Sequence, residues 1–506
     1  MLTFIVFCIY GQTLAHEFVN FDDYAYITLN ENVNSGFSWS GIHWAFTQYH
    51  VGNWHPVTWL SHMLDVELFG LNPGGHHATN VLFHALNVFL LLFFLDLAGF
   101  HIWVSVPMAA LFAVHPTHTE SVAWISERKD VLSTFFFLIA LITYLKFARQ
   151  RTLPRYFLLC TILVAGLMAK SMLVTLPFVL LLLDFYPLKR LDGLRAFLRL
   201  SWEKLPLFAL CFGMVFVTFT AQQSGGAMFS GMGLNLVDRI ENAIVAYSDY
   251  VVMAIVPANL ALYYPHPGHW PLDVVLLALA LLTTITVTVV WNFRTRPYLV
   301  LGWFWFIGTM IPVIGLIQIG GQYMANRYTY IPYIGLFIAL IPLLWELSGK
   351  MTNGKNFYGA ALMGMLVFYS AVTWQTTGHW KNTITLFTHS LLVTDPDYEE
   401  LVLSPERFIN TERTLTPGHF TPYTRLGFAY GAQGDFALSV RHFDIAVQHS
   451  RNEPSAYTNL GLAFAALGDK AAARVAFNKA LEIDPSLESV KANLRKLGGD
   501  QILNDR

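Results

Sequence analysis

The feature that most constrains this chain is a succession of apolar runs separated by short polar loops. A membrane-spanning helix needs about 20 mostly apolar residues. Eleven runs approach that length: residues 2–14, 81–97, 102–114, 131–147, 156–168, 172–186, 205–220, 272–291, 298–317, 328–347 and 357–374. Only 13% of the residues are charged, about half the share of an ordinary soluble protein. The pattern predicts an all-α, polytopic membrane protein with about 11 transmembrane helices.

The basic residues predict the orientation of these helices, because loops rich in lysine and arginine stay in the cytoplasm. Such loops cover residues 146–155, 189–204, 294–296 and 350–355. The stretch 237–264 is also apolar, but it carries Arg239, Glu241 and Asp249. If it crossed the membrane, the loop at 294–296 would lie outside. We therefore expect a non-spanning helix on the outer face, a cytoplasmic N-terminus and a C-terminal region outside.

Charge density and a sequence repeat separate a soluble region from the membrane region. The last 131 residues hold 28 charged side chains, against 36 in the first 375. We therefore predict a membrane domain at 1–375 and a soluble domain at 376–506. Within the latter, one pattern recurs after 34 residues, the tetratricopeptide period. Its matched positions are Tyr423, Gly427, Tyr430, Gly434, Ala437, Phe443 and Ala446, repeated as Tyr457, Gly461, Phe464, Gly468, Ala471, Phe477 and Ala480.

Tetratricopeptide arrays stack into a superhelix whose groove binds peptides or proteins. The candidate groove residues are Tyr423, Tyr430, Tyr457 and Asn459. The alternative is a packing cap without a ligand. Nucleic acid is an unlikely partner of any part of the chain, because the formal net charge is −2 and nucleic-acid binding requires a cationic surface.

Two loops predicted on the outer face carry the candidate chemistry. Asp22 and Asp23 follow the first apolar run, where adjacent carboxylates can supply a general base or bind a divalent cation. A charged pair at a membrane surface without chemistry is the alternative. The second loop, residues 115–130, holds two histidines, acids and bases in 16 residues, a density that favours a polar ligand or metal site over a surface turn.

Two isolated basic residues, Lys170 and Arg327, fall at the same predicted face. A guanidinium or ammonium group there can pair with a phosphate. Snorkelling of the charged head toward water is the alternative for each.

Taken together, these motifs resemble the bacterial relatives of the transmembrane and tetratricopeptide-repeat O-mannosyltransferases, of the GT-C class. The resemblance covers almost the whole chain. It rests on Phe21-Asp22-Asp23-Tyr24, Asn53-Trp54-His55-Pro56, Thr58-Trp59-Leu60-Ser61-His62, the His-Pro-x-His-x-Glu-Ser motif at 115–121, Glu127-Arg128-Lys129-Asp130, Lys170-Ser171-Met172, Asn326-Arg327-Tyr328-Thr329-Tyr330 and the repeats. Residues 395–421 depart from the pattern by inserting a polar, proline-containing stretch before the first repeat.

The resemblance implies transfer of a sugar from a polyprenyl-phosphate carrier to Ser or Thr of a protein, outside the bacterial cytoplasmic membrane, with the repeats in the periplasm. It implies Asp22 and Asp23 as catalytic residues. For the donor phosphate we expect Arg327, Lys170 and Arg128. For a polar or metal site, holding Mg or Mn as cofactor, we expect Glu120, His118 and His115.

Three other functions compete with this one. A GT-C transferase with a lipid or glycan acceptor would leave the repeats unexplained. A non-enzymatic membrane scaffold would leave the charged outer loops unexplained. A transporter is disfavoured, because few ionisable residues lie within the apolar runs.

Overall fold

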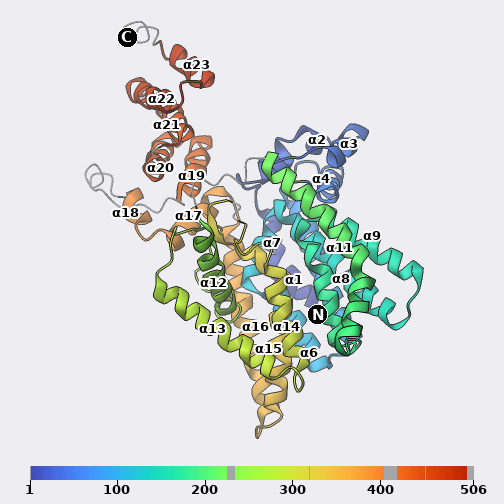
Figure 1. Ribbon diagram of the computed structural model, residues 1–506. Helices are drawn as coiled ribbons and strands as arrows, with labels where there is room; N and C mark the ends of the chain where they lie inside the picture. Colours follow the sequence, from blue (N-terminus) through green and yellow to red (C-terminus); the bar gives the residue numbers. More distant parts are fainter. Residues whose placement is uncertain (1, 225–233, 318–319, 404–418, 451, 499–506) are drawn as a thin grey trace. The chain divides into compact units, whose positions relative to one another are not determined.

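The computed structural model describes residues 2–224, 234–317, 320–403, 419–450 and 452–498. The chain divides into two compact units (Figure 1). The first comprises Met1–Leu260 with Gly268–Lys381, and the second Ala261–Pro267 with Asn382–Arg506. The boundary predicted at 376 falls inside a helix that ends at His379. The short segment at 261–267 belongs to the second unit, where the backbone N–H of Tyr263 donates to Ser390 Oγ at 3.3 Å.

The first unit is helical, as the apolar runs predict. Its helices are α1 (Leu2–Tyr10), α2 (Glu31–Asn34), α3 (Trp39–Thr47), α4 (Pro56–Phe69), α5 (Pro73–Leu97), α6 (Ile102–Val114), α7 (Thr119–Ala123), α8 (Arg128–Arg149), α9 (Leu153–Ala169), α10 (Leu176–Phe185), α11 (Gly193–Ser224), α12 (Leu236–Met253), α13 (Leu272–Trp291), α14 (Pro297–Met310), α15 (Pro332–Ser348) and α16 (Gly354–His379). Short helical turns are η1 (Gly11–Ala15), η2 (Tyr24–Thr28), η3 (Pro116–His118), η4 (Ile125–Glu127), η5 (Ser171–Thr175) and η6 (Asn326–Thr329), and β2 is Gln322–Met324.

Each of the 11 predicted runs coincides with one of these helices. Five segments of the described chain are long and apolar enough to cross a membrane: Pro73–Leu97, Ile125–Arg149, Gly193–Ser224, Leu272–Trp291 and Gly354–His379. The other six runs form shorter apolar helices. The stretch 237–264, predicted as a non-spanning helix, contains α12, which ends at Met253.

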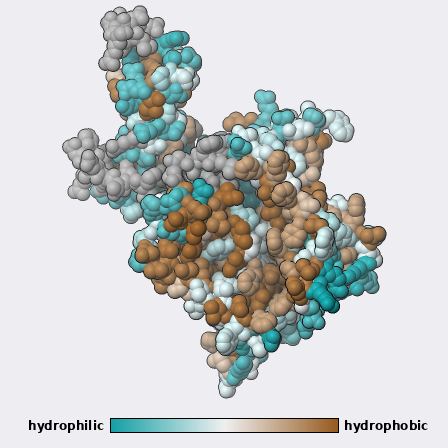
Figure 2. Space-filling view, in the orientation of Figure 1, coloured by the Kyte–Doolittle hydropathy of each residue, from teal (hydrophilic) through white to brown (hydrophobic). Residues whose placement is uncertain are grey.

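Apolar side chains cover much of the visible face of the first unit (Figure 2). On α13, Leu272 is 69% exposed, Leu277 75% and Trp291 85%. An apolar surface of this extent is unfavourable in water, whereas it is compatible with contact to lipid chains. The outward faces of these helices therefore fit a membrane.

Helices α14 and α15 approach each other through a pair of glycines. A Cβ atom at Gly302 would lie 2.4 Å from the carbonyl oxygen of Gly335, and one at Gly335 would lie 2.6 Å from that of Gly302. Small residues permit such close backbone contact between membrane helices. This contact fixes the position of α15, which follows the turn η6 that carries Arg327.

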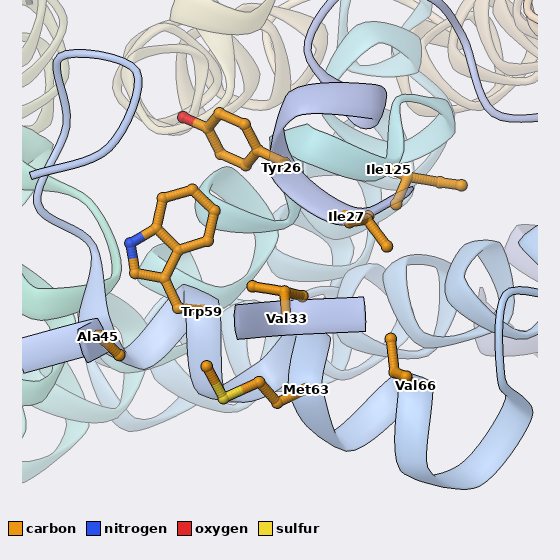
Figure 3. Close-up of a cluster of buried hydrophobic side chains, with 8 residues drawn as sticks. All are labelled: Tyr26, Ile27, Val33, Ala45, Trp59, Met63, Val66 and Ile125. Carbon is orange, nitrogen blue, oxygen red and sulfur yellow. The ribbon is translucent and has the colours of Figure 1, made fainter. Parts of the chain in front are cut away.

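The first loop forms a small helical subdomain with its own core. Figure 3 shows this cluster of buried side chains: Tyr26, Ile27, Val33, Ala45, Trp59, Met63, Val66 and Ile125. The first seven belong to η2 and α2–α4, whereas Ile125 belongs to η4, at the start of the α8 segment. The core therefore holds the loop that carries Asp22 and Asp23 against the beginning of α8.

The second unit contains the repeats. Its elements are β1 (Tyr264–Pro265), α17 (Thr383–Thr394), α18 (Tyr398–Leu403), α19 (Phe420–Ala432), α20 (Phe436–His449), α21 (Pro454–Leu467), α22 (Lys470–Ile483) and α23 (Glu488–Lys496). The two hairpins pack through the same contact, as the repeat predicts. A Cβ atom at Gly427 would lie 2.8 Å from the Phe443 ring, and one at Gly461 would lie 2.6 Å from the Phe477 ring.

Candidate active site

The loop between α6 and α8 is folded into the protein and does not form a surface turn. It runs through η3, the short helix α7 and η4, and every residue from His115 to Asp130 is buried. Buried charges are costly unless they are paired and hydrogen-bonded. The many charged groups of this loop must therefore be paired inside the protein.

Six charged residues from three parts of the chain form one continuous set of ion pairs, which we call the charged network. Its members are Glu120, Glu127, Lys129, Asp130, Lys170 and Arg327. Glu127 lies at the centre. Its Oε1 is 3.1 Å from Lys129 Nζ and 3.6 Å from Arg327 Nε, and its Oε2 is 3.2 Å from Lys170 Nζ. Arg327 also pairs with Glu120, and Lys170 with Asp130.

The cations form the more accessible part of the charged network. The side chains of Lys129, Lys170 and Arg327 are 10%, 14% and 13% exposed, whereas those of Glu120 and Glu127 are each 2% exposed. Burial raises the pKa of Glu120, and the opposing charge of Arg327 reduces that shift.

Aromatic rings surround these cationic heads. The Arg327 guanidinium lies 5.6 Å from the Trp124 ring and 4.9 Å from the Tyr328 ring. Lys129 Nζ lies 4.9 Å from the Tyr26 ring and 5.8 Å from that of Trp124. Cation–π attraction favours these positions. Trp124 also stacks on Phe21 at 5.2 Å, so it connects the charged network to the first loop.

Asp23 is fully buried and positions the first loop. One carboxylate oxygen accepts the backbone N–H of Val19 at 2.9 Å. The other accepts both the backbone N–H of Ser126, at 2.9 Å, and its hydroxyl. Burial raises the pKa of Asp23 to about 6, although these hydrogen bonds oppose the shift. Asp23 therefore joins the first loop to η4.

Asp22 lies beside Asp23 but is only half-buried. Its backbone oxygen accepts the N–H of Tyr26 at 2.8 Å, whereas its carboxylate has no hydrogen-bond partner among the described residues. That carboxylate interacts electrostatically with Lys129 and Tyr26, so it lies near the charged network. Of the two predicted catalytic acids, Asp22 is the less buried one and the one whose carboxylate is not engaged by hydrogen bonds from the described residues.

Arg128 lies outside the charged network. Its Nη2 donates to Asp65 Oδ2 at 2.5 Å and to the His76 carbonyl at 2.8 Å. Its Nη1 donates to Ser61 Oγ at 2.8 Å, and its Nε donates to Asn80. Neighbouring residues on a helix point about 100° apart, so Arg128 faces α4 and α5 while Lys129 faces the charged network. The guanidinium is fully buried and occupied by these hydrogen bonds, so Arg128 has a structural role.

His115, His118 and Glu120 do not meet in one metal site. His115 Nδ1 contacts Thr117 Oγ1 at 2.8 Å, and His118 Nδ1 contacts the Phe112 carbonyl at 2.9 Å. Both imidazoles pack against aromatic rings, and burial lowers the pKa of His115 to about 3. Within the described ranges, the three-residue groups that could hold a metal lie elsewhere: His62–Asp65–His76, Asp395–His419–His449 and Asp238–Glu241–His269.

The four residues predicted for an acceptor groove differ in accessibility. Tyr423 is fully buried and donates its hydroxyl to Asp395 Oδ2 at 2.8 Å. It therefore cannot contact a bound peptide in this arrangement. Tyr430, Tyr457 and Asn459 are half-buried and stay candidates.

Four residues that border the site or belong to it occur in the sequence motifs, but the motifs gave no role to any of them. Three of them adjoin Arg128 in sequence: Glu127, Lys129 and Asp130. Which of these side chains face the charged network depends on the residue at which α8 begins, and that residue is not evident from the sequence. His55 precedes the N1 proline of α4 and is buried. Burial lowers its pKa to about 3, with further contributions from Lys129 and Lys170. Its electrostatic neighbours therefore belong to the charged network.

Comparison with known proteins shows similarity to one family model and to several membrane transferases. A family model described as tetratricopeptide repeat matches residues 454–487. The chain is 36% identical over 147 residues to the mouse protein O-mannosyl-transferase TMTC1, covering 27% of this chain and 15% of the relative. It is 34% identical over 151 residues to human TMTC2, covering 28% and 18%.

A third relative, the Caenorhabditis elegans protein O-mannosyl-transferase F38B6.6, is 24% identical over 354 residues, which is 67% of this chain and 49% of that protein. The matched region thus spans half or less of these three relatives. No solved structure matches the chain.

Proposed function

We propose that this protein is a GT-C membrane glycosyltransferase that moves a sugar from a polyprenyl-phosphate carrier to Ser or Thr hydroxyls of a protein. The observation that carries the proposal is the position of half-buried Asp22 beside the cations of the charged network, which are more exposed than Glu120 and Glu127. A general base and an anion-binding group are the two components that the reaction requires. The names of the related proteins support the same reaction class.

The cations would stabilise the departing phosphate. Arg327 donates hydrogen bonds from its Nη1 and its backbone N–H to the Glu120 carboxylate, and its Nε pairs with Glu127. Its Nη2 has no hydrogen-bond partner among the described residues, so it is available to a phosphate oxygen. Lys129 and Lys170 would add charge beside it. Cations held in place before the reaction stabilise a developing negative charge more effectively than water does.

The proposed transfer is a single displacement. Asp22 takes the proton of the acceptor hydroxyl as the hydroxyl oxygen bonds to the anomeric carbon. The bond from that carbon to the phosphate oxygen breaks, and its electrons leave with the polyprenyl phosphate. Attack from the face opposite the leaving group inverts the anomeric configuration. Asp23 would hold the first loop in place through Val19 and Ser126 and would not contact the substrate.

The charged network does not fit a divalent cation such as Mg or Mn. Each of its carboxylates already pairs with Lys129, Lys170 or Arg327. Oxygen ligands for these metals would have to be released from those pairs, so no step of the proposed transfer uses a metal.

The acceptor would reach the site as a protein or peptide held by the repeats. We place both the charged network and the repeats on the outer face of a bacterial cytoplasmic membrane, with the repeats in the periplasm. This follows from the basic loops of the sequence, which the positive-inside rule assigns to the cytoplasm. Tyr430, Tyr457 and Asn459 would line the acceptor groove.

A direct test uses the purified chain in lipid nanodiscs with synthetic polyprenyl-phosphate mannose and a serine- and threonine-rich peptide. Mass spectrometry would detect a hexose-sized increment on the peptide. Intact-mass comparison of envelope proteins from cells with and without the gene would identify the natural sugar and acceptor. Transfer only to added lipid or glycan would favour that acceptor class, and an unchanged donor would favour a scaffold.

A further inference from the structure

A second cluster of potential ligands lies in the repeat unit and shares no residue with the proposed transfer site. Asp395, His419 and His449 are 7%, 3% and 8% exposed. Each can place one ligand atom within 4.8 Å of the other two. Asp395 follows α17, His419 precedes α19 and His449 ends α20. The cluster therefore joins three elements that are separated in sequence.

The geometry of the cluster approaches that of a metal centre. His419 Nδ1 lies 3.8 Å from Asp395 Oδ2, and the rings of His419 and His449 lie 5.6 Å apart at 75°. Two ligands of a tetrahedral zinc ion are roughly 3.3 Å apart, because zinc bonds to nitrogen and oxygen are about 2.0–2.2 Å long. Contraction by a fraction of an ångström would bring Asp395 and His419 to that spacing.

The surroundings of Asp395 favour a cation. Within the described residues, no lysine or arginine pairs with its carboxylate; Tyr423 donates to Oδ2 at 2.8 Å, and the N–H of Asp397 donates to Oδ1 at 3.1 Å. A hydrogen bond of this kind orients a carboxylate ligand. The Tyr423 ring also stacks on His449 at 5.3 Å and 19°, so one side chain holds two of the candidate ligands.

The other two clusters are less suited to a buried metal ion, one because of a paired cation and the other because of its exposure. In His62–Asp65–His76, the Asp65 carboxylate already pairs with Arg128 at 2.5 Å, and that positive charge would repel a metal ion. In Asp238–Glu241–His269, Asp238 accepts the N–H of Asn235 at 2.8 Å in the capping box of α12, and His269 is 79% exposed. The repeat-unit cluster is therefore the buried one that can accept positive charge.

We propose that Asp395, His419 and His449 bind a divalent transition-metal ion, with zinc as the best fit. Two imidazoles and one carboxylate are a donor set that suits zinc better than magnesium or calcium, which prefer oxygen. The ion would tie the two ends of the inserted stretch at 395–421 to the first full repeat.

The test uses the full chain in detergent, carrying an affinity tag without histidine. After treatment with a chelator and its removal, the protein is titrated with Co²⁺ alone. We expect one equivalent to bind with the visible absorption of tetrahedral or five-coordinate cobalt. His419→Gln and His449→Gln should lose that absorption, and Tyr423→Phe should weaken binding by about 10–100-fold, as loss of an outer-shell partner does.

Matched controls separate this site from general loss of a histidine. His442 lies on the same helix as His449 and is buried, but it is not part of the cluster. His442→Gln and His62→Gln should therefore bind Co²⁺ as the parent does. Asp395→Asn, which keeps the shape of the side chain, should bind at least about tenfold more weakly. Absence of binding to the parent, or equal binding by His419→Gln and His449→Gln, would overturn the proposal.

Discussion

At the scale of single residues, the two adjacent carboxylates of the first loop have different roles. Asp23 accepts three hydrogen bonds inside the protein, whereas Asp22 is only half-buried. The sequence could not separate them, because both follow the same apolar run. The difference arises from Ser126, a residue of η4 that is distant in sequence and is brought to Asp23 by the core shown in Figure 3.

The first prediction follows from this difference. Asp22→Asn should reach the membrane at a normal level and melt as the parent does, because the Asp22 carboxylate makes no hydrogen bond to the described residues, but transfer should fall by about a hundredfold or more. Asp23→Ala should lower the free energy of unfolding by about 1–3 kcal/mol, because it leaves buried donors without an acceptor. Transfer assays and thermal unfolding in detergent measure the two effects. Full activity of Asp22→Asn would remove it as the base.

Arg327 gives a second prediction at this scale. Arg327→Lys should reduce transfer strongly, because an ammonium group cannot contact Glu120 and a phosphate with the same planar fork. Arg327→Met alone would leave Glu120 as an unpaired buried acid, which costs about 3–5 kcal/mol when a buried ion pair is broken. The double variant Arg327→Met, Glu120→Gln should recover stability but not transfer. Recovery of both would make Arg327 a structural residue.

At the scale of helices, the apolar runs were enough to locate the long apolar helices of the first unit but not their ends. Each predicted run lies on a helix, yet α5 begins at Pro73, ahead of residue 81, since Asn72 caps it and proline is favoured at the first position. The run predicted from residue 328 begins within η6, the turn that holds Arg327, and α15 starts only at Pro332. The structure of the loops, including α2–α4, depends on distant contacts that periodicity does not encode.

The third prediction tests helix contact with a control on the same helix. Gly302→Ala should lower the free energy of unfolding by about 1–3 kcal/mol, because its Cβ atom would overlap the backbone of α15. Gly308→Ala, also on α14, has open space around its Cβ position. It should therefore be neutral or slightly stabilising, since alanine is the better helix former. Thermal unfolding of both variants in detergent measures the difference, and equal melting would contradict the glycine contact.

At the scale of the whole molecule, the division into a membrane unit and a repeat unit could be anticipated from charge density and from the 34-residue period. Both are properties of many residues, so errors at single positions do not affect them. Assignment of 261–267 to the second unit could not be anticipated, because that segment is surrounded in sequence by the first.

The fourth prediction concerns orientation. If the basic loops lie in the cytoplasm, a reporter enzyme that is active only outside the membrane should be active when fused after Arg506. The same reporter fused within the basic loop at 189–204 should be inactive. A fluorescent protein that matures only in the cytoplasm should give the opposite pattern at both sites. Fluorescence from the C-terminal fusion would reverse the proposed topology.

The balance of charge in the charged network has a thermodynamic consequence. Its three acids and three bases cancel, so an anionic donor would bring unbalanced negative charge into a buried site. The pKa of Glu120 is already raised by burial, and a neighbouring phosphate would raise it further. Donor binding should therefore be accompanied by proton uptake, and by linkage its affinity should increase as the pH falls toward the Glu120 pKa. Calorimetry in two buffers with different ionisation enthalpies would measure the number of protons taken up on donor binding. Glu120→Gln should abolish this proton uptake.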